Sequence, residues 1–164
     1  MQLDKEKTNF ILTQMLAGAA LDEFKVHSTQ LQMCFLKDDP LDGRLIAIQL
    51  IFGCGAFVSD DTNQKNGVKH SDSDFFKERA NFLSEIYMLI GREITSVCVD
   101  DNFNLSITVE KIAIINVCIR PDDLDEGEWL WKVSLQDELN NSNNIPTSVY
   151  CVTEGGRLSF WSET

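Results

Sequence analysis

The chain of 164 residues has few of the residues on which catalytic and metal sites are usually built. It contains two histidines, His27 and His70, and five cysteines, none of them spaced as a CxxC pair. The usual zinc-knuckle and thioredoxin-like motifs are therefore excluded. Neither histidine lies in a catalytic motif, and the sequence has no phosphate-binding glycine loop, GxSxG or HExxH. We expect a protein that is not an enzyme and that holds no metal ion or cofactor.

Long apolar runs are also missing. Residues 1–9 are polar, and no apolar segment follows a basic start, so we expect no secretory signal. The longest apolar run, residues 45–52, is interrupted by Gln49 and is too short to cross a bilayer. The sequence therefore predicts a protein that does not enter a membrane.

The cysteines point to a reducing compartment. Cys34, Cys98, Cys118 and Cys151 lie in apolar, strand-like segments, where a free thiol behaves as a small buried hydrophobic group. Their odd total and wide spacing do not suggest a disulfide framework. We expect free thiols and a cytoplasmic location.

Basic residues are scarce relative to acidic ones. The chain has 14 lysines and arginines against 26 aspartates and glutamates, a formal net charge of −12. Such a charge repels nucleic acid phosphates and anionic membranes, and it speeds the approach of basic proteins. Nucleic acid is therefore not expected as a partner. The alternative reading is that the acidity serves solubility alone.

Apolar residues make up 43% of the chain, and their spacing predicts both helices and strands. Helical periodicity indicates helices over residues 5–17 and 74–90, the first capped by Asp4 and the second by a Ser71-x-x-Asp74 capping box. Gly18 and Gly91 are natural stops for these helices.

Alternating apolar residues and turn signals predict the strands. They cover residues 21–28, 30–37, 44–52, 56–58, 93–99, 103–110, 112–119, 129–135, 147–153 and 157–162, the last two as a hairpin spanning 147–162. Residues 44–52 are read as buried on both faces. Trp129 and Trp131 are assigned to core or interface packing in preference to stacking on bases or sugars. The fold class is α+β, with two helices packed on antiparallel β-meanders in a single domain of residues 1–164.

The two halves of the chain look alike. Residues 15–18 and 88–91 read MLAG and MLIG, 73 positions apart, and each precedes a strand of similar pattern. A tandem duplication with repeats at 4–58 and 72–135 is one interpretation. The other is that any two amphipathic helices followed by strands would align equally well.

Two groups of acidic residues are candidates for partner binding. The denser group lies in residues 120–128, between two apolar strands, and the other lies in the turn of residues 38–43. If the loops gather at one end of the sheets, the groups form one surface for a basic protein; otherwise they are solvated loops. The candidate residues are Asp122, Asp123, Asp125, Glu126, Glu128, Asp38, Asp39 and Asp42.

Residues 91–131 carry a family resemblance. The pattern is Gly91-x-x-Ile94, then Asp101-x-x-x-Leu105-x-Ile107, then the strand at 112–119 and an acidic stretch ending in Glu128-Trp129. It resembles small bacterial immunity domains found beside polymorphic and contact-dependent inhibition toxins.

The resemblance implies a protein that binds one cognate toxin in the producing cell and blocks it. Many such toxins are nucleases with basic surfaces, which would suit an acidic partner. The family shares no catalytic residues that could be assigned to this chain. A non-catalytic adaptor or assembly subunit, and a hydrolase whose acid and base come from distant positions, remain the alternatives.

Overall fold

Two helices and two antiparallel sheets make up the described part of this computed structural model, which comprises residues 1–40, 43–60, 75–120, 129–136, 146–154 and 157–163. The larger sheet has, in spatial order, β1 (Gln2–Leu3), β11 (Arg157–Glu163), β10 (Ser148–Glu154), β9 (Trp129–Leu135), β4 (Leu45–Phe52), β3 (Leu31–Asp38) and β2 (Ala20–Val26). The smaller sheet has β5 (Gly55–Asp60), β8 (Ala113–Cys118), β7 (Leu105–Val109) and β6 (Ile94–Val99). The predicted α+β class is confirmed.

Helix α1 (Lys5–Leu16) begins at the predicted residue and ends one residue before the predicted end. The Asp4 carboxylate accepts a hydrogen bond from the Lys7 N–H at 2.7 Å, which satisfies one of the free donors of the first turn. Gly18 then adopts φ +82°, a conformation that few residues other than glycine tolerate. Helix α2 (Phe75–Tyr87) ends three residues earlier than predicted and is followed by turns up to Gly91, which has φ +80°. Its predicted capping box lies outside the described residues.

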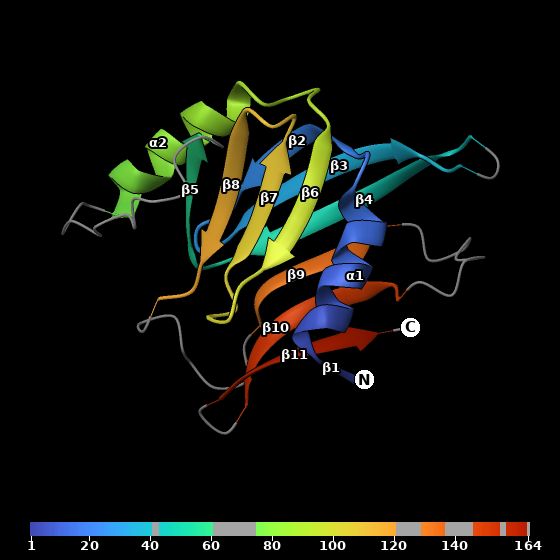
Figure 1. Ribbon diagram of the computed structural model, residues 1–164. Helices are drawn as coiled ribbons and strands as arrows, with labels where there is room; N and C mark the ends of the chain where they lie inside the picture. Colours follow the sequence, from blue (N-terminus) through green and yellow to red (C-terminus); the bar gives the residue numbers. More distant parts are fainter. Residues whose placement is uncertain (41–42, 61–74, 121–128, 137–145, 155–156, 164) are drawn as a thin grey trace.

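The core lies between the two sheets and the helices. In Figure 1 the four-stranded sheet lies in front of β2, β3 and β4, with α1 beside β6 and α2 beside β5. The alternating apolar residues of β3 and β7 face inward, as predicted, and the side chains buried there form one cluster with those of the helices. Trp131 is fully buried in the same cluster, which confirms its role in packing.

The structure corrects two sequence-based expectations and adds one strand that the sequence did not predict. Strand β4 is fully buried on one face only, at Ile48, Leu50 and Phe52, while its other face is half-buried, because only one side meets the second sheet. Cys98 is exposed, since β6 alternates and turns this side chain outward. The sequence gives no sign of β1, because a strand of two residues is too short to show alternation.

The halves compared above are interlocked. Strand β5, the last strand of the first half, pairs with β8 of the second, and β9, the last strand of the second half, pairs with β4 of the first. Each half therefore completes the sheet of the other, and neither sheet is built from one half alone. The hairpin β10–β11 and strand β1 extend the larger sheet beyond β9.

The junction between the halves is reciprocal under the same offset of 73 positions. The Gly18 N–H donates to Ile94 O at 2.9 Å, and the Gly91 N–H donates to Leu21 O at 2.7 Å. Two further bonds follow the same exchange, from Ile94 N–H to Ala19 O and from Leu21 N–H to Arg92 O. The duplication itself stays a prediction, and these four bonds support it.

Candidate partner-binding surfaces

Most of the acidic residues predicted to bind a partner lie outside the described residues. This applies to Asp42 and to the whole of residues 121–128, which contain Asp122, Asp123, Asp125, Glu126 and Glu128. Asp38 and Asp39 are described. Asp38 is exposed at the end of β3, opposite Leu45, and Asp39 closes the hairpin by donating its N–H to Arg44 O at 2.7 Å.

Strand β4 separates the described ends of these two groups. Asp38 lies beside Leu45, the first residue of β4. At the other end of β4, the Gly53 N–H donates to Leu130 O, next to the start of β9. Seven residue steps of extended chain span about 23 Å. The chain therefore enters β9, just after residues 121–128, at the end of β4 opposite to Asp38. A continuous acidic surface that joins the two groups stays a prediction.

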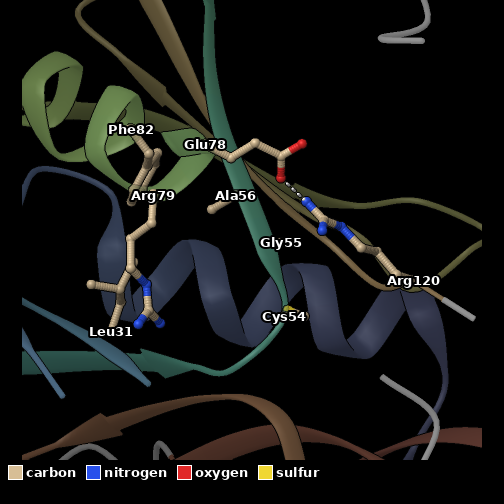
Figure 2. A pocket seen from close by; sticks show the side chains of 8 residues that line it. All are labelled: Leu31, Cys54, Gly55, Ala56, Glu78, Arg79, Phe82 and Arg120. Atoms are coloured by element: carbon tan, nitrogen blue, oxygen red, sulfur yellow. Dashed lines mark hydrogen bonds and ion pairs between the residues drawn. The ribbon is translucent and has the colours of Figure 1, made fainter. Parts of the chain in front are cut away.

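Arg120, the last described residue before 121–128, lies beside β5 in a packed site and points toward Glu78 of α2 (Figure 2). Its guanidinium pairs with the Glu78 carboxylate at 2.5 Å. It also lies over Gly55, where a Cβ would come within 2.6 Å of Arg120 Nε, so a side chain at this position would displace the guanidinium. The free volume is about 20 Å³, enough for about one water molecule. The Arg120 site therefore positions elements and is too small to bind a ligand.

The neighbouring Arg79 joins α2 to the turn between β2 and β3. Its guanidinium donates to the carbonyl oxygens of His27 and Ser28, each at 3.2 Å. Burial lowers the pKa of Arg79. Together with the Arg120 site, this contact fixes α2 at both sheets, since β2 and β5 belong to different ones.

A larger hollow lies where the start of α1, the β6–β7 turn and β11 meet. We call it the α1 groove. Its volume is about 300 Å³, at the lower end for ligand-binding pockets. Its walls combine apolar side chains with carboxylates and one lysine. The lining residues are Gln2, Leu3, Asp4, Lys5, Asp100, Asp101, Phe103, Leu158, Ser159 and Phe160.

Each carboxylate of the α1 groove already has a hydrogen-bond partner within the chain. Asp4 caps α1, as described above. The Asp100 carboxylate accepts bonds from the N–H groups of Asn102 and Asn104 at 2.8 and 2.9 Å, and so shapes the turn. Asp101 pairs with Lys5, and this bond raises the pKa of the Lys5 ammonium. Three aspartates against one lysine give the groove lining a formal charge of −2.

Two contacts anchor Phe103 on the apolar side of the α1 groove. Phe103 has φ +64°, uncommon for a bulky side chain, and its carbonyl accepts a hydrogen bond from the buried Trp131 Nε1 at 3.0 Å. Its ring lies 4.5 Å from the ring of Phe160 on β11. The strained backbone is thus held by a partly buried hydrogen bond and a ring contact, which fix the position of Phe103 in the groove wall.

Burial disfavours the reactive thiolate at three of the described thiols, those of Cys34, Cys118 and Cys151. Burial raises the pKa of Cys118 to about 11 and that of Cys151 to about 12, so both remain protonated near neutral pH. Burial and the nearby carboxylates of Glu23 and Asp22 also raise the pKa of Cys34. A thiol is a poor nucleophile in this state. Over the described part of the chain, no three histidine, cysteine or acidic side chains gather closely enough to hold a metal ion.

Comparisons with known proteins place no constraint on these surfaces. No family model, curated protein or solved structure matches the chain. Within the described residues, neither helix is long and apolar enough to span a membrane.

Sequence reasoning missed the α1 groove because three distant segments form it. In the sequence, Asp100 and Asp101 lie between the strands predicted at 93–99 and 103–110, and Leu158 and Phe160 lie in the predicted hairpin of residues 147–162. Neither pattern shows that the turn and the hairpin meet beside Asp4. The helix cap at Asp4 was the signal available, since it fixes where α1 starts.

Proposed function

We propose that the chain is an immunity protein that binds and neutralises one cognate bacterial toxin, with a basic nuclease as the favoured class. The observation that carries the proposal is the net charge of −12. Part of this negative charge lies in the acidic lining of the α1 groove. The resemblance over residues 91–131 supports the same reading. The cytoplasm of the producing cell is the proposed location.

Inhibition by such a protein needs binding without chemistry. Opposite charge speeds association and favours the right partner, while a few buried contacts hold the complex. Cognate nuclease and immunity pairs reach dissociation constants on the order of 10⁻¹³ M or below. Affinity of that order requires a preformed surface, and the packed wall of Phe103, Phe160 and Trp131 supports this requirement.

The test is affinity capture of the tagged chain from its native cells, washed first at low and then at high salt. One stoichiometric basic protein that survives the high-salt wash, and whose toxicity the chain suppresses on co-expression, is the expected result. A diffuse set of proteins lost at high salt would favour an adaptor and overturn the proposal. A captured partner that remains toxic in the presence of the chain would also overturn it.

A further inference from the structure

The outer edge of β11 is only partly covered. Strand β1 pairs with Phe160 and Trp161, and the Ser162 N–H donates to Met1 O at 2.9 Å. Backbone groups in an antiparallel ladder alternate in direction, so Leu158, like Ser162, turns its N–H and C=O outward. Among the described residues, no strand pairs with Leu158 on that side. Within the described residues, the outer edge of β11 therefore carries no paired strand at Leu158, directly beyond the point where the chain leaves β1 for α1.

The α1 groove lies beside this open edge. Leu158 and Phe160 line the groove from β11, and Phe103 lies across from them. Residues opposite each other in an antiparallel pair point to the same face of the sheet. A strand added along β11, in the direction of β1, would therefore place the side chain opposite Leu158 in the groove.

The groove favours a long side chain with a positive end. Its apolar part, at Leu158, Phe103 and Phe160, suits an alkyl stem, and its rim at Asp100 and Asp101 suits a cation. Lys5 already pairs with one oxygen of Asp101. The Lys5 ammonium would therefore compete with an incoming cation for this carboxylate. Lysine and arginine have the required shape, whereas a carboxylate would be repelled.

We propose that the partner inserts an extended segment that pairs with the outer edge of β11 and places a lysine or arginine side chain in the α1 groove. Strand addition to a sheet edge is a recurring mode of peptide recognition, in which backbone bonds supply affinity and side-chain pockets supply specificity. The inference rests on the proposed function only in taking the segment from a protein partner.

The direct test needs no knowledge of the toxin. A labelled peptide of sequence TVKVKVT is titrated into the full chain by fluorescence polarisation at low salt, beside a TVEVEVT peptide as its matched control. The lysine peptide should bind about tenfold more tightly, which corresponds to about 1.4 kcal/mol. In nitrogen-15 NMR spectra, its binding should shift the amide signals of Leu158 and Phe103. Equal binding of both peptides, or shifts confined to other surfaces, would overturn the proposal.

Charge variants separate the groove from general attraction. Asp101→Lys should weaken binding of the lysine peptide about fivefold, and Lys5→Gln should strengthen it, because the resident cation is removed. Glu85→Lys, an exposed position on α2, changes the net charge as much as Asp101→Lys and should leave binding unchanged. Equal weakening by Asp101→Lys and Glu85→Lys would mean that the peptide senses only the overall charge, and would refute the groove.

Backbone variants test the added strand. Leu158→Pro removes the outward N–H, and proline is tolerated where that N–H is not used by the ladder. It should abolish binding, whereas Leu158→Ala, which keeps the N–H, should retain most of it. Failure of these variants to affect capture of a toxin identified as above would refute the groove while leaving the proposed function intact. Peptide binding at the groove without any captured toxin would support the groove and refute the proposed function.

Discussion

Gly18 and Gly91 allow a quantitative test of the reciprocal junction. Both have positive φ, +82° and +80°, and both donate their N–H to the opposite half. A Cβ at Gly18 would meet only Glu93 Oε1, at 4.0 Å, and one at Gly91 would meet nothing within 4 Å. Alanine therefore adds no clash at either place. Its cost is the left-handed backbone, about 1 to 2 kcal/mol, less a few tenths regained from a stiffer unfolded chain.

We expect Gly18→Ala and Gly91→Ala each to lower the free energy of unfolding by about 1 kcal/mol. The assay is urea unfolding followed by tryptophan fluorescence and by far-ultraviolet circular dichroism. With a slope of about 2 kcal/mol per molar urea, each midpoint should fall by about 0.5 M. Gly43→Ala is the matched control, since it has φ +69° and no atom within 4 Å but lies in the β3–β4 hairpin, away from the junction.

Equivalence of the two glycines requires that Gly18→Ala and Gly91→Ala lower the free energy of unfolding by equal amounts. If Gly18→Ala and Gly91→Ala differed by more than about 1 kcal/mol, their equivalence under the offset of 73 positions would be wrong in energetic terms. If either change cost more than about 3 kcal/mol, strain would not be the whole cause, because left-handed alanine does not account for so much.

Three further predictions concern thiols, acid stability and the core. At pH 8 the folded protein should show one fast-reacting thiol with Ellman's reagent, the exposed Cys98, while the buried Cys151 reacts only on unfolding; fast labelling of Cys98→Ser would contradict this. The Ser148 hydroxyl, followed by the Lys132 ammonium, holds the pKa of Glu163 below its ordinary value of 4.5, so the stabilisation is fully present above that value and is lost as pH falls through the lowered pKa. Glu163→Gln should therefore destabilise the fold at pH 7, and the difference in urea midpoint from the unaltered protein should shrink steadily as pH falls below 4.5; a difference that does not change with pH would contradict this. Trp131→Phe removes part of a fully buried side chain and leaves the partly buried Phe103 carbonyl without its donor, so it should cost about 2 to 4 kcal/mol in dichroism-monitored unfolding. A loss below about 1 kcal/mol would mean that water replaces the indole.

Local chemistry explains which parts of the fold were predictable from sequence. The ends of α1 follow from the side chain of Asp4 and the freedom of Gly18, and the inward face of β7 follows from strict alternation. Alternation also misled, since Cys98 lies in an apolar stretch but on the exposed face. The pattern shows that a strand has an apolar side without showing which way that side points when its neighbours are unknown.

The same local patterns could not predict which strands pair with one another. Nothing in residues 129–135 indicates that β9 pairs with β4, because an alternating strand fits any apolar neighbour of matching length. The α1 groove depends on three such long-range placements at once. Asp100 and Asp101 could be recognised as turn residues, but their proximity to Leu158 follows only from the complete sheet order.

The exchange of β5 and β9 between the halves also governs how the chain is made. The larger sheet cannot continue past β4 until Trp129–Leu135 has left the ribosome, more than 70 residues after β4 itself. Contacts this distant in sequence slow folding, and unpaired strands are exposed to aggregation while they wait. A chain cut short before β9 would therefore leave a nascent product with an open sheet, which chaperones and proteases would have to clear.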